Sequence, residues 1–263
     1  MTSLAEGVRS LAADLRIGVS FCTRLPLLLR APLEKNDIAR ASWAMPIAGA
    51  LVGLFAALSY WLGWRLGVGS LSAAMLAVVA MMLATGALHE DGLADTLDGF
   101  GGGITRDRKL EIMRDSRIGT YGACGLAVSL ILRSSALAAI TDPLPVAIAV
   151  VVAHASARAI LPAFMRLVPP ARSDGLSAHA GRPPWASVAA AALLGVMSLV
   201  AGFGPAPAVI CMLLLASGGL FVAWLTLQQI GGQTGDVLGA LEQVGEILIL
   251  MTAAALFRSP LEL

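Results

Sequence analysis

The sequence predicts an all-α, polytopic integral membrane protein, a bundle of about seven helices preceded by an amphipathic helix at the membrane surface. Hydrophobic residues make up 57% of the 263-residue chain and the mean hydropathy is +0.81, which is too apolar for an ordinary soluble domain. The apolar residues gather in runs of about 20, the length with which a helix crosses a bilayer. We therefore expect a single membrane-embedded domain over residues 1–263, with residues 1–42 as an amphipathic N-terminal segment.

The N-terminal segment predicts the surface helix. Its apolar residues recur at helical spacing while the charged residues fall elsewhere on the wheel, a pattern typical of a helix lying in the membrane interface. The apolar positions are Leu4, Val8, Leu11, Leu15 and Val19.

Seven apolar runs predict the spanning helices. They cover residues 43–64, 71–88, 121–140, 146–165, 185–203 and 206–227, and a last run reaches residue 257. Because the second run leads into an acidic motif without an evident breaker, we expect its helix to continue to Asp98. It would then project about 15 Å beyond the apolar part and place the acidic residues at the membrane–water boundary. Residues 104–120 and 166–184 are expected to be polar loops.

Lys and Arg residues predict the orientation. Six lie in the N-terminal segment, five in residues 89–120 and three in residues 166–184, whereas only Arg65 and Arg258 lie on the opposite side. Cytoplasmic loops carry the excess of basic residues in membrane proteins. The count therefore places the N-terminus, the acidic motif and both polar loops in the cytoplasm, and the net charge of +1 gives no indication of nucleic-acid binding.

The acidic motif is the densest group of charges in the chain, with four carboxylates between residues 90 and 98. On a helix Asp91, Asp95 and Asp98 would fall within about 60° of one another. Like charges at this spacing repel unless a cation compensates them, and oxygen ligands suit a hard ion such as Mg²⁺ or Mn²⁺. With Glu90 they form the candidate metal shell. A solvated acidic helix end is the alternative, but the apolar run directly before the motif favours the metal site.

A basic, glycine-rich loop follows the acidic motif. Metal ions and basic side chains together neutralise phosphate oxygens in phosphoryl transfer, so this pairing favours such chemistry. Arg106, Arg114 and Arg117 are the candidates for substrate binding, and Asp115 lies between the last two. Topology-setting charge or lipid-headgroup contact is the alternative for each of these cations.

Three ionisable residues lie inside predicted spans. Arg133, His154 and Arg158 would be costly there unless they face a partner or a water-filled cavity. His154 and Arg158, four residues apart, share a helix face. They are candidates for substrate binding, with a structural ion pair as the alternative.

Asp236 is the one acidic candidate far from the motif. It could cap the last helix, but Glu242 and Glu246 continue the acidic character into that helix, which a cap alone would not need. Glycines beside Asp236 would let the backbone approach a ligand closely. We therefore expect Asp236 to face the same cavity as the acidic motif.

Three segments in fixed order carry a resemblance to a known family. HEDGLADTLDG at residues 89–99, LEIMRDSRIGTYG at 110–122 and TGDVLGA at 234–240 closely resemble the cobalamin synthase family, also called adenosylcobinamide-GDP ribazoletransferases. Residues 21–26 and 46–49 look like its N-terminal signatures. The resemblance extends from about residue 15 to residue 250.

The resemblance implies a Mg²⁺-dependent, multi-pass transferase of the prokaryotic cytoplasmic (inner) membrane. Such an enzyme joins adenosylcobinamide-GDP to α-ribazole or its 5′-phosphate and releases GMP. The implied partners are corrinoid and nucleoside small-molecule substrates and membrane lipids, without nucleic acid, and the sequence leaves a homo-oligomer open.

The candidate site thus has three groups of residues. Catalysis is assigned to Asp98, Asp115 and Asp236, with the general base undecided among them, and the metal to Glu90, Asp91, Asp95 and Asp98. Substrate binding is assigned to His89, Arg106, Arg114, Arg117, Arg133, His154 and Arg158. A lipid-synthesising enzyme resembling the CDP-alcohol phosphotransferases and a secondary transporter are the alternatives. The chain lacks the Ala-Arg that follows Asp-Gly in the former and shows no internal repeat typical of the latter.

Overall fold

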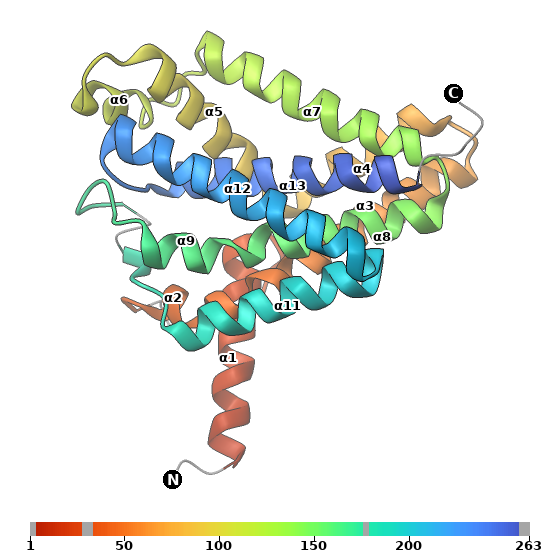
Figure 1. Ribbon diagram of the computed structural model, residues 1–263, viewed down its shortest axis with the longest axis horizontal. Coiled ribbons are helices and arrows are strands. Elements are labelled where there is room, and N and C mark those ends of the chain that lie inside the picture. The colour runs from red at the N-terminus through yellow and green to blue at the C-terminus, as the bar shows by residue number, and fades with distance from the viewer. Residues whose placement is uncertain (1–3, 28–33, 176–178, 258–263) are drawn as a thin grey trace.

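The structure is a computed structural model that describes residues 4–27, 34–175 and 179–257, with side chains from residue 10 onward. Long helices run side by side in one bundle (Figure 1). The described ranges contain no β-strand, and one isolated parallel bridge joins Pro170 to Gln233. The all-α prediction is confirmed.

Six helical stretches are long and apolar enough to cross a membrane. A bent pair of helices, α4 (Ser70–Thr85) and α5 (Leu88–Gly102), adds a seventh if it is taken as one span. The prediction of a polytopic bundle of about seven helices is therefore confirmed. The six stretches are α2 with α3 (Asp37–Ala41 and Met45–Arg65), α7 (Thr120–Ile140), α8 with α9 (Pro143–Ala159 and Leu161–Leu167), α11 (Trp185–Phe203), α12 (Pro205–Ile230) and α13 (Gly235–Phe257).

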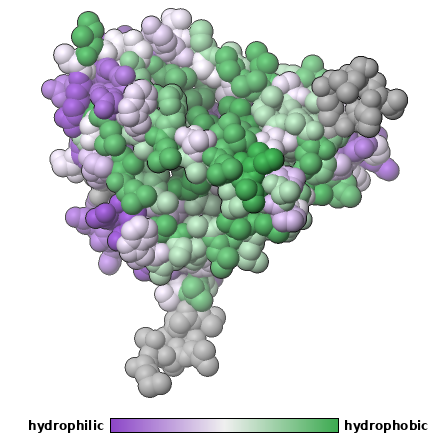
Figure 2. Space-filling view, in the orientation of Figure 1, coloured by the Kyte–Doolittle hydropathy of each residue, from purple (hydrophilic) through white to green (hydrophobic). Residues whose placement is uncertain are grey.

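The outer surface of the bundle is suited to lipid. Only 22% of the apolar 18-residue stretch of α12 is buried inside the protein. Figure 2 shows the body of the molecule covered largely by hydrophobic residues, with hydrophilic ones gathered toward one end. Large apolar side chains are exposed on several helices, including Leu54, Leu83, Ile131, Leu213 and Leu220. Acyl chains can cover these side chains, whereas water could not do so without a large free-energy cost.

The polar connections lie at one end of the bundle. Helix α6 (Arg106–Ile112), α2 and the start of α11 are found there, whereas the α7–α8 and α11–α12 turns and the end of α13 lie at the other end (Figure 1). The two polar loops that the Lys and Arg count placed on one side thus lie at the same end. Helix α1 (Leu4–Cys22) runs crosswise to the long helices, an orientation that suits a helix in the membrane interface.

The helix that leads into the acidic motif is broken, so the prediction that it continues unbroken to Asp98 is wrong. Helix α4 ends at Thr85, and α5 starts at Leu88 in a direction bent by 90°. The acidic residues therefore do not project from the membrane on an extended helix. They begin among the packed helices, and α5 leads from there to the polar end of the bundle.

Backbone geometry and a tertiary contact produce this break. Gly86 and Ala87 have φ of 68° and 57°, and the Ala87 N–H donates to the Met82 carbonyl at 2.8 Å, which is a helix ending of the Schellman type. The Arg24 N–H donates to the Ala84 carbonyl at 2.7 Å. This bond satisfies a carbonyl left without a partner at the end of α4. The N-terminal segment thus helps to hold the chain where α5 begins.

Two other boundaries also differ from the prediction. The polar loop at residues 104–120 contains the short helix α6, which Thr105 caps by accepting the Arg108 N–H. The predicted span 146–165 is divided at Ile160 into α8 and α9. Pro162 has no N–H for the carbonyl four residues earlier, and its ring crowds that carbonyl, which accounts for an interruption at this point.

Helices α3 and α8 pack at unusually short range. A Cβ atom on Gly49 would lie 2.1 Å from the His154 carbonyl oxygen, and one on Gly53 would lie 2.5 Å from the Val151 Cα. Only glycine allows this approach of the two backbones. This approach helps to set the place of His154 in the interior.

We expect Gly49→Ala to destabilise the protein, because its new methyl group would collide with the backbone of α8 and overpacking typically costs about 1–3 kcal/mol. Gly219→Ala on α12 is the matched control, since a Cβ there meets nothing within 4 Å. Thermal unfolding of both variants in detergent checks this. A Gly49→Ala midpoint as high as that of Gly219→Ala would contradict the packing argument.

Candidate functional site

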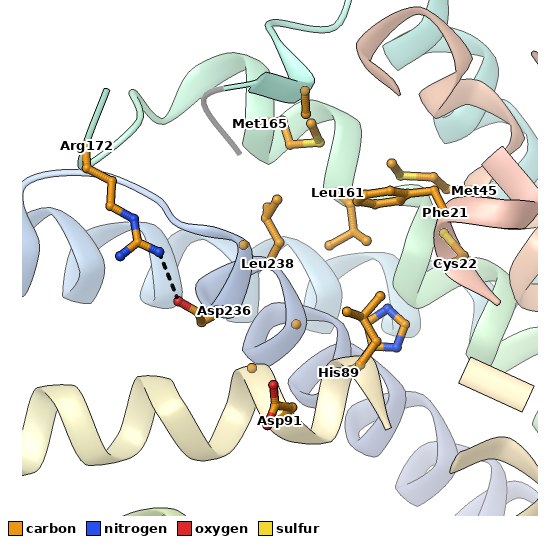
Figure 3. A pocket seen from close by; sticks show the side chains of 15 residues that line it. Phe21, Cys22, Met45, His89, Asp91, Leu161, Met165, Arg172, Asp236 and Leu238 are labelled. Atoms are coloured by element: carbon orange, nitrogen blue, oxygen red, sulfur yellow. Dashed lines mark ion pairs between the residues drawn. The ribbon is translucent and has the colours of Figure 1, made fainter. Parts of the chain in front are cut away.

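A cavity of about 130 Å³ lies between α5, α13, α9 and the end of α1. One side is apolar, and the other carries the polar groups of α5, of α13 and of the segment after α9 (Figure 3). The lining residues that matter for its chemistry are His89, Asp91, Arg172 and Asp236. Phe21, Cys22, Leu161 and Met165 contribute to the apolar side.

Two glycines bring α5 against α13. A Cβ on Gly92 would lie 2.7 Å from the Asp236 carbonyl oxygen, and one on Gly239 would lie 3.2 Å from the His89 Cα. The two backbones therefore approach closely, and Asp91 and Asp236 both line the cavity. The expectation that Asp236 faces the same cavity as the acidic motif is confirmed.

Asp236 is not the cap of α13. The Thr234 side-chain oxygen accepts the Val237 N–H at 3.3 Å and thus caps the helix. Asp236 stands in the first turn, where its Oδ2 accepts a hydrogen bond from the Thr234 hydroxyl at 3.1 Å. Its other interactions are directed toward the cavity, so the capping alternative does not explain this carboxylate.

Asp95 lies one helical turn after Asp91 and is partly buried. The negative charges of Asp91, Asp98 and Asp236 all act on it. Such a concentration of carboxylates is unfavourable unless a cation or bound protons compensate it. The carboxylates around Asp95 therefore remain a candidate cation site.

Both carboxylate oxygens of Asp98 are hydrogen-bonded to the protein backbone. Its two carboxylate oxygens accept the backbone N–H groups of Gly119 at 2.7 Å and Gly122 at 2.8 Å, at the start of α7. A carboxylate at a helix N-terminus is stabilised by the free N–H groups and the helix dipole. Asp98 thus joins α5 to α7, and a Cβ on either glycine would collide with it. The residue is less available as a base or metal ligand than the sequence suggested.

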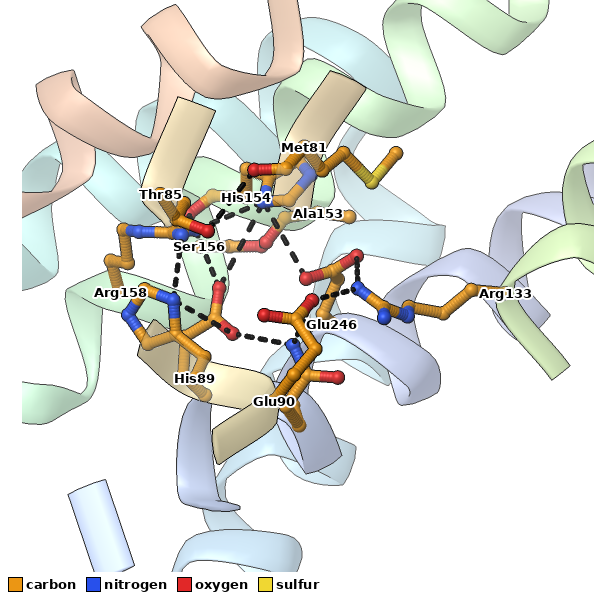
Figure 4. A network of polar contacts seen from close by, with 12 residues as sticks. Met81, Thr85, His89, Glu90, Arg133, Ala153, His154, Ser156, Arg158 and Glu246 are labelled. Carbon is orange, nitrogen blue, oxygen red and sulfur yellow. Dashed lines mark hydrogen bonds and ion pairs between the residues drawn. The ribbon is translucent and has the colours of Figure 1, made fainter. Parts of the chain in front are cut away.

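Glu90 and the charges inside the spans form a buried ionic network (Figure 4). Arg133 Nη1 donates to Glu90 Oε1 at 3.0 Å and to Glu246 Oε1 at 3.3 Å. Arg158 Nη1 lies 2.5 Å from Glu242 Oε1. The side chains of both arginines are at most 1% exposed. Each of these charged groups therefore has an oppositely charged neighbour on another helix.

The two histidines complete the network. Arg158 Nη2 lies 3.3 Å from His89 Nδ1, and its Nη1 lies 2.9 Å from His154 Nδ1. His154 Nδ1 is also 3.5 Å from Glu246 Oε2. Helices α5, α7, α8 and α13 are thus joined through one set of buried polar groups.

This network bears on several of the predicted site residues. Glu90 pairs with Arg133 in the interior and does not line the cavity, so it is not presented there together with Asp91. Arg133, His154 and Arg158 contact protein groups in the sealed interior and do not line the cavity, so they are not placed to bind substrate. His89 belongs both to the network and to the cavity wall.

The basic residues of the polar loop also have protein partners. Arg106 Nε donates to the Ile230 carbonyl at 2.8 Å and its Nη2 to the Ala171 carbonyl. Arg114 pairs with Asp174 at 2.6 Å. These two arginines hold segments at the polar end together and do not line the cavity.

Asp115 and Arg117 form an exposed pair with a shortest contact of 2.6 Å. Hydrogen bonds from Arg117 lower the pKa of Asp115 to about 2. A carboxylate with so low a pKa is a weak base at neutral pH, and it lies outside the cavity. The structure therefore does not support Asp115 as the general base, and Arg117 does not reach the cavity.

Arg172 is a cavity residue that the sequence did not single out for the site. It lines the cavity, and its Nη2 lies 3.8 Å from Asp236 Oδ2. Nothing in the sequence distinguishes it from Arg166 and Arg182 in the same loop. Its position depends on how that loop docks against the segment before α13.

The donor groups around the cavity fit a hard divalent cation. Asp91 and Asp236 in the cavity wall, and Asp95 one turn further along α5, offer carboxylate oxygens, the ligands that Mg²⁺ and Mn²⁺ prefer. Within the described residues, the one set of three donor atoms already within 4.8 Å of one another is that of His154, Glu242 and Glu246. Two arginine side chains also contact these carboxylates, so their charge is already compensated. The aspartates are the better candidates.

Fold and cavity together define a multi-pass membrane protein with a cavity between its helices that carries the carboxylates of Asp91 and Asp236 on one side. The family model described as cobalamin-5-phosphate synthase matches residues 14–254. The chain belongs to this family. The match favours the family over a CDP-alcohol phosphotransferase or a transporter.

Similar curated proteins carry one name, adenosylcobinamide-GDP ribazoletransferase. The protein of this name from Bradyrhizobium diazoefficiens is 58% identical over 95% of this chain and 96% of its own. That from Mesorhizobium japonicum is 48% identical over 98% and 99%. That from Azorhizobium caulinodans is 43% identical over 91% and 94%. No solved structure matches the chain.

We expect Arg133→Met to be strongly destabilising, because Glu90 and Glu246 would remain buried without their cation. Breaking a buried pair in this way costs about 3–5 kcal/mol. Arg65→Met, at the exposed end of α3, should change stability little. Thermal unfolding in detergent compares the two variants, and equal midpoints would mean that the network does not stabilise the fold.

Proposed function

We propose that this chain is an adenosylcobinamide-GDP ribazoletransferase, which joins adenosylcobinamide-GDP to α-ribazole or its 5′-phosphate and releases GMP. The observation that carries the proposal is the identity of 58% over nearly the full length of a protein of that name. The carboxylates in the cavity wall support it, because enzymes of phosphoryl-group transfer commonly use a carboxylate-bound metal ion and a carboxylate base.

Asp91 and Asp95 are the proposed metal ligands. Both stand on α5, one turn apart. When bound, Mg²⁺ would neutralise phosphate oxygens and stabilise the charge that passes to the leaving GMP. Asp98 supports this pair indirectly, because its bonds to Gly119 and Gly122 fix the far half of α5.

Asp236 is the proposed general base. It is the sequence-predicted catalytic carboxylate that lines the cavity, and Thr234 and Arg172 orient it. It would take the proton from the ribazole hydroxyl while the hydroxyl oxygen forms a bond to the phosphorus attached to the corrinoid side chain. The bond from that phosphorus to the bridging oxygen breaks, and GMP leaves with the electron pair.

The proposed location is the cytoplasmic membrane of a prokaryotic cell, with the polar end of the bundle in the cytoplasm. The excess of Lys and Arg in the connections at this end supports the orientation. The cavity would then receive nucleotide and ribazole substrates from the cytoplasm.

The test of function is GMP release by the purified protein from adenosylcobinamide-GDP plus α-ribazole, with Mg²⁺ varied. Turnover should require both substrates and Mg²⁺. Asp91→Asn and Asp236→Asn should each lose at least about 100-fold, because general bases and metal ligands typically contribute this much or more.

Asp107→Asn is the matched control, since Asp107 is exposed on α6 away from the cavity. It should turn over normally. No GMP release from the unaltered protein would exclude the proposed activity. Full activity in Asp236→Asn would instead exclude Asp236 as the base.

The proposed orientation predicts the accessibility of single cysteines in a cysteine-free background. Gly103→Cys, at the polar end after α5, should react with a membrane-impermeant reagent only after the cells are opened. Asp142→Cys, in the α7–α8 turn at the other end, should react in intact cells. The reverse labelling pattern would contradict the proposed orientation and indicate that the polar end faces the outside of the cell.

A further inference from the structure

Arg172 holds a guanidinium group over the cavity without a full set of partners. Its side chain is only 19% exposed. Nη1 is buried and has no hydrogen-bond partner in the part of the chain that the structure describes. Nη2 lies 3.8 Å from Asp236 Oδ2, which is an electrostatic contact but too long for a hydrogen bond. A buried donor without a partner is unfavourable, so the group is suited to a ligand.

The backbone beside Arg172 is held firmly. The Ala171 N–H donates to the Gln233 carbonyl at 2.9 Å, and the Gln233 N–H donates to the Pro169 carbonyl at 2.8 Å. Arg106 donates to the Ala171 and Ile230 carbonyls on both sides of this junction. The segment that carries Arg172 is thus docked on the segment that leads into α13. These contacts fix the backbone beside Arg172, so that the position of the guanidinium is limited before a ligand binds.

Other cations cannot take its place at the cavity. Arg133 and Arg158 are sealed in the buried network, and Arg114 and Arg117 pair with carboxylates at the surface. Among the described residues, Arg172 is the one Lys or Arg that lines this cavity. Without Arg172, the cavity wall around Asp91 and Asp236 would offer an approaching anionic substrate no Lys or Arg side chain.

We infer that Arg172 binds a phosphate group of the nucleoside diphosphate part of the substrate, beside the aspartates. This inference rests on the proposed function. The contact explains how a cavity that carries two carboxylates can accept an anionic substrate. A guanidinium offers parallel N–H donors that match two phosphate oxygens, which a lysine ammonium does not. Asp236 remains close enough to orient the guanidinium electrostatically.

The test measures binding, so that it does not depend on turnover. Calorimetry on the full chain in detergent would use GDP, inorganic pyrophosphate and guanosine as probes. Arg172→Gln should weaken GDP and pyrophosphate about tenfold or more, because charge-assisted hydrogen bonds are among the strong ones. Arg172→Lys should recover only part of this loss, and guanosine binding should not change.

Arg182→Gln is the matched control, since this exposed arginine of the same loop does not line the cavity. Its GDP affinity should stay within about twofold of the unaltered protein, a difference well below the tenfold that 1.4 kcal/mol represents. A loss equal to that of Arg172→Gln would overturn the inference, because it would indicate a diffuse effect of loop charge.

A second background separates phosphate binding from simple pairing with Asp236. If Arg172 only balances that carboxylate, Arg172→Gln should have no effect on GDP affinity once Asp236→Asn is present. Phosphate binding instead predicts the same loss of about tenfold in both backgrounds. The inference is overturned if the double variant binds GDP as tightly as Asp236→Asn alone. It is also overturned if the unaltered protein binds neither GDP nor pyrophosphate. Arg172-dependent binding without GMP release would refute only the proposed reaction.

Discussion

The rest of the structure depends on the ionic network buried between α5, α7, α8 and α13. Isolated charges in an apolar interior cost several kcal/mol each, and the cost is offset only when every partner is in place. Arg133 needs Glu90 and Glu246, and Arg158 needs Glu242 and the two histidines. Four helices must therefore assemble together. This requirement places the first turn of α5 inside the bundle, next to the cavity.

The residues of the acidic motif consequently have different contacts along one short helix. His89 and Glu90 turn inward and join the network, Asp91 faces the cavity, and Asp98 binds the start of α7. Residues of one sequence motif thus serve different purposes because successive helical positions point in different directions. The structural residues at both ends hold the helix, and Asp91 and Asp95 between them are the proposed metal ligands.

The sequence was sufficient for most of the fold. Apolar runs of spanning length predicted the bundle, and the run 185–203 coincides with α11, which lies between Pro184 and Gly204. The break between α4 and α5 was missed, because Gly86 lies in a run that is otherwise favourable for a helix. There, Ala87 adopts φ of 57°, and the contact of Arg24 with Ala84 that accompanies the break comes from a distant part of the chain.

For the site, the sequence by itself determined which residue types were present, their spacing, and the resemblance that identified the family. It also brought Asp91 and Asp236 into one hypothesis, because chemistry and predicted topology agreed. Only the tertiary structure decided which charges are free to act. Arg133 and Arg158 are enclosed by carboxylates from other helices, whereas Arg172 is presented to the cavity by a clamp between two loops. Such partners are distant in sequence and close only after packing, so no local pattern can distinguish a structural arginine from one that binds a ligand.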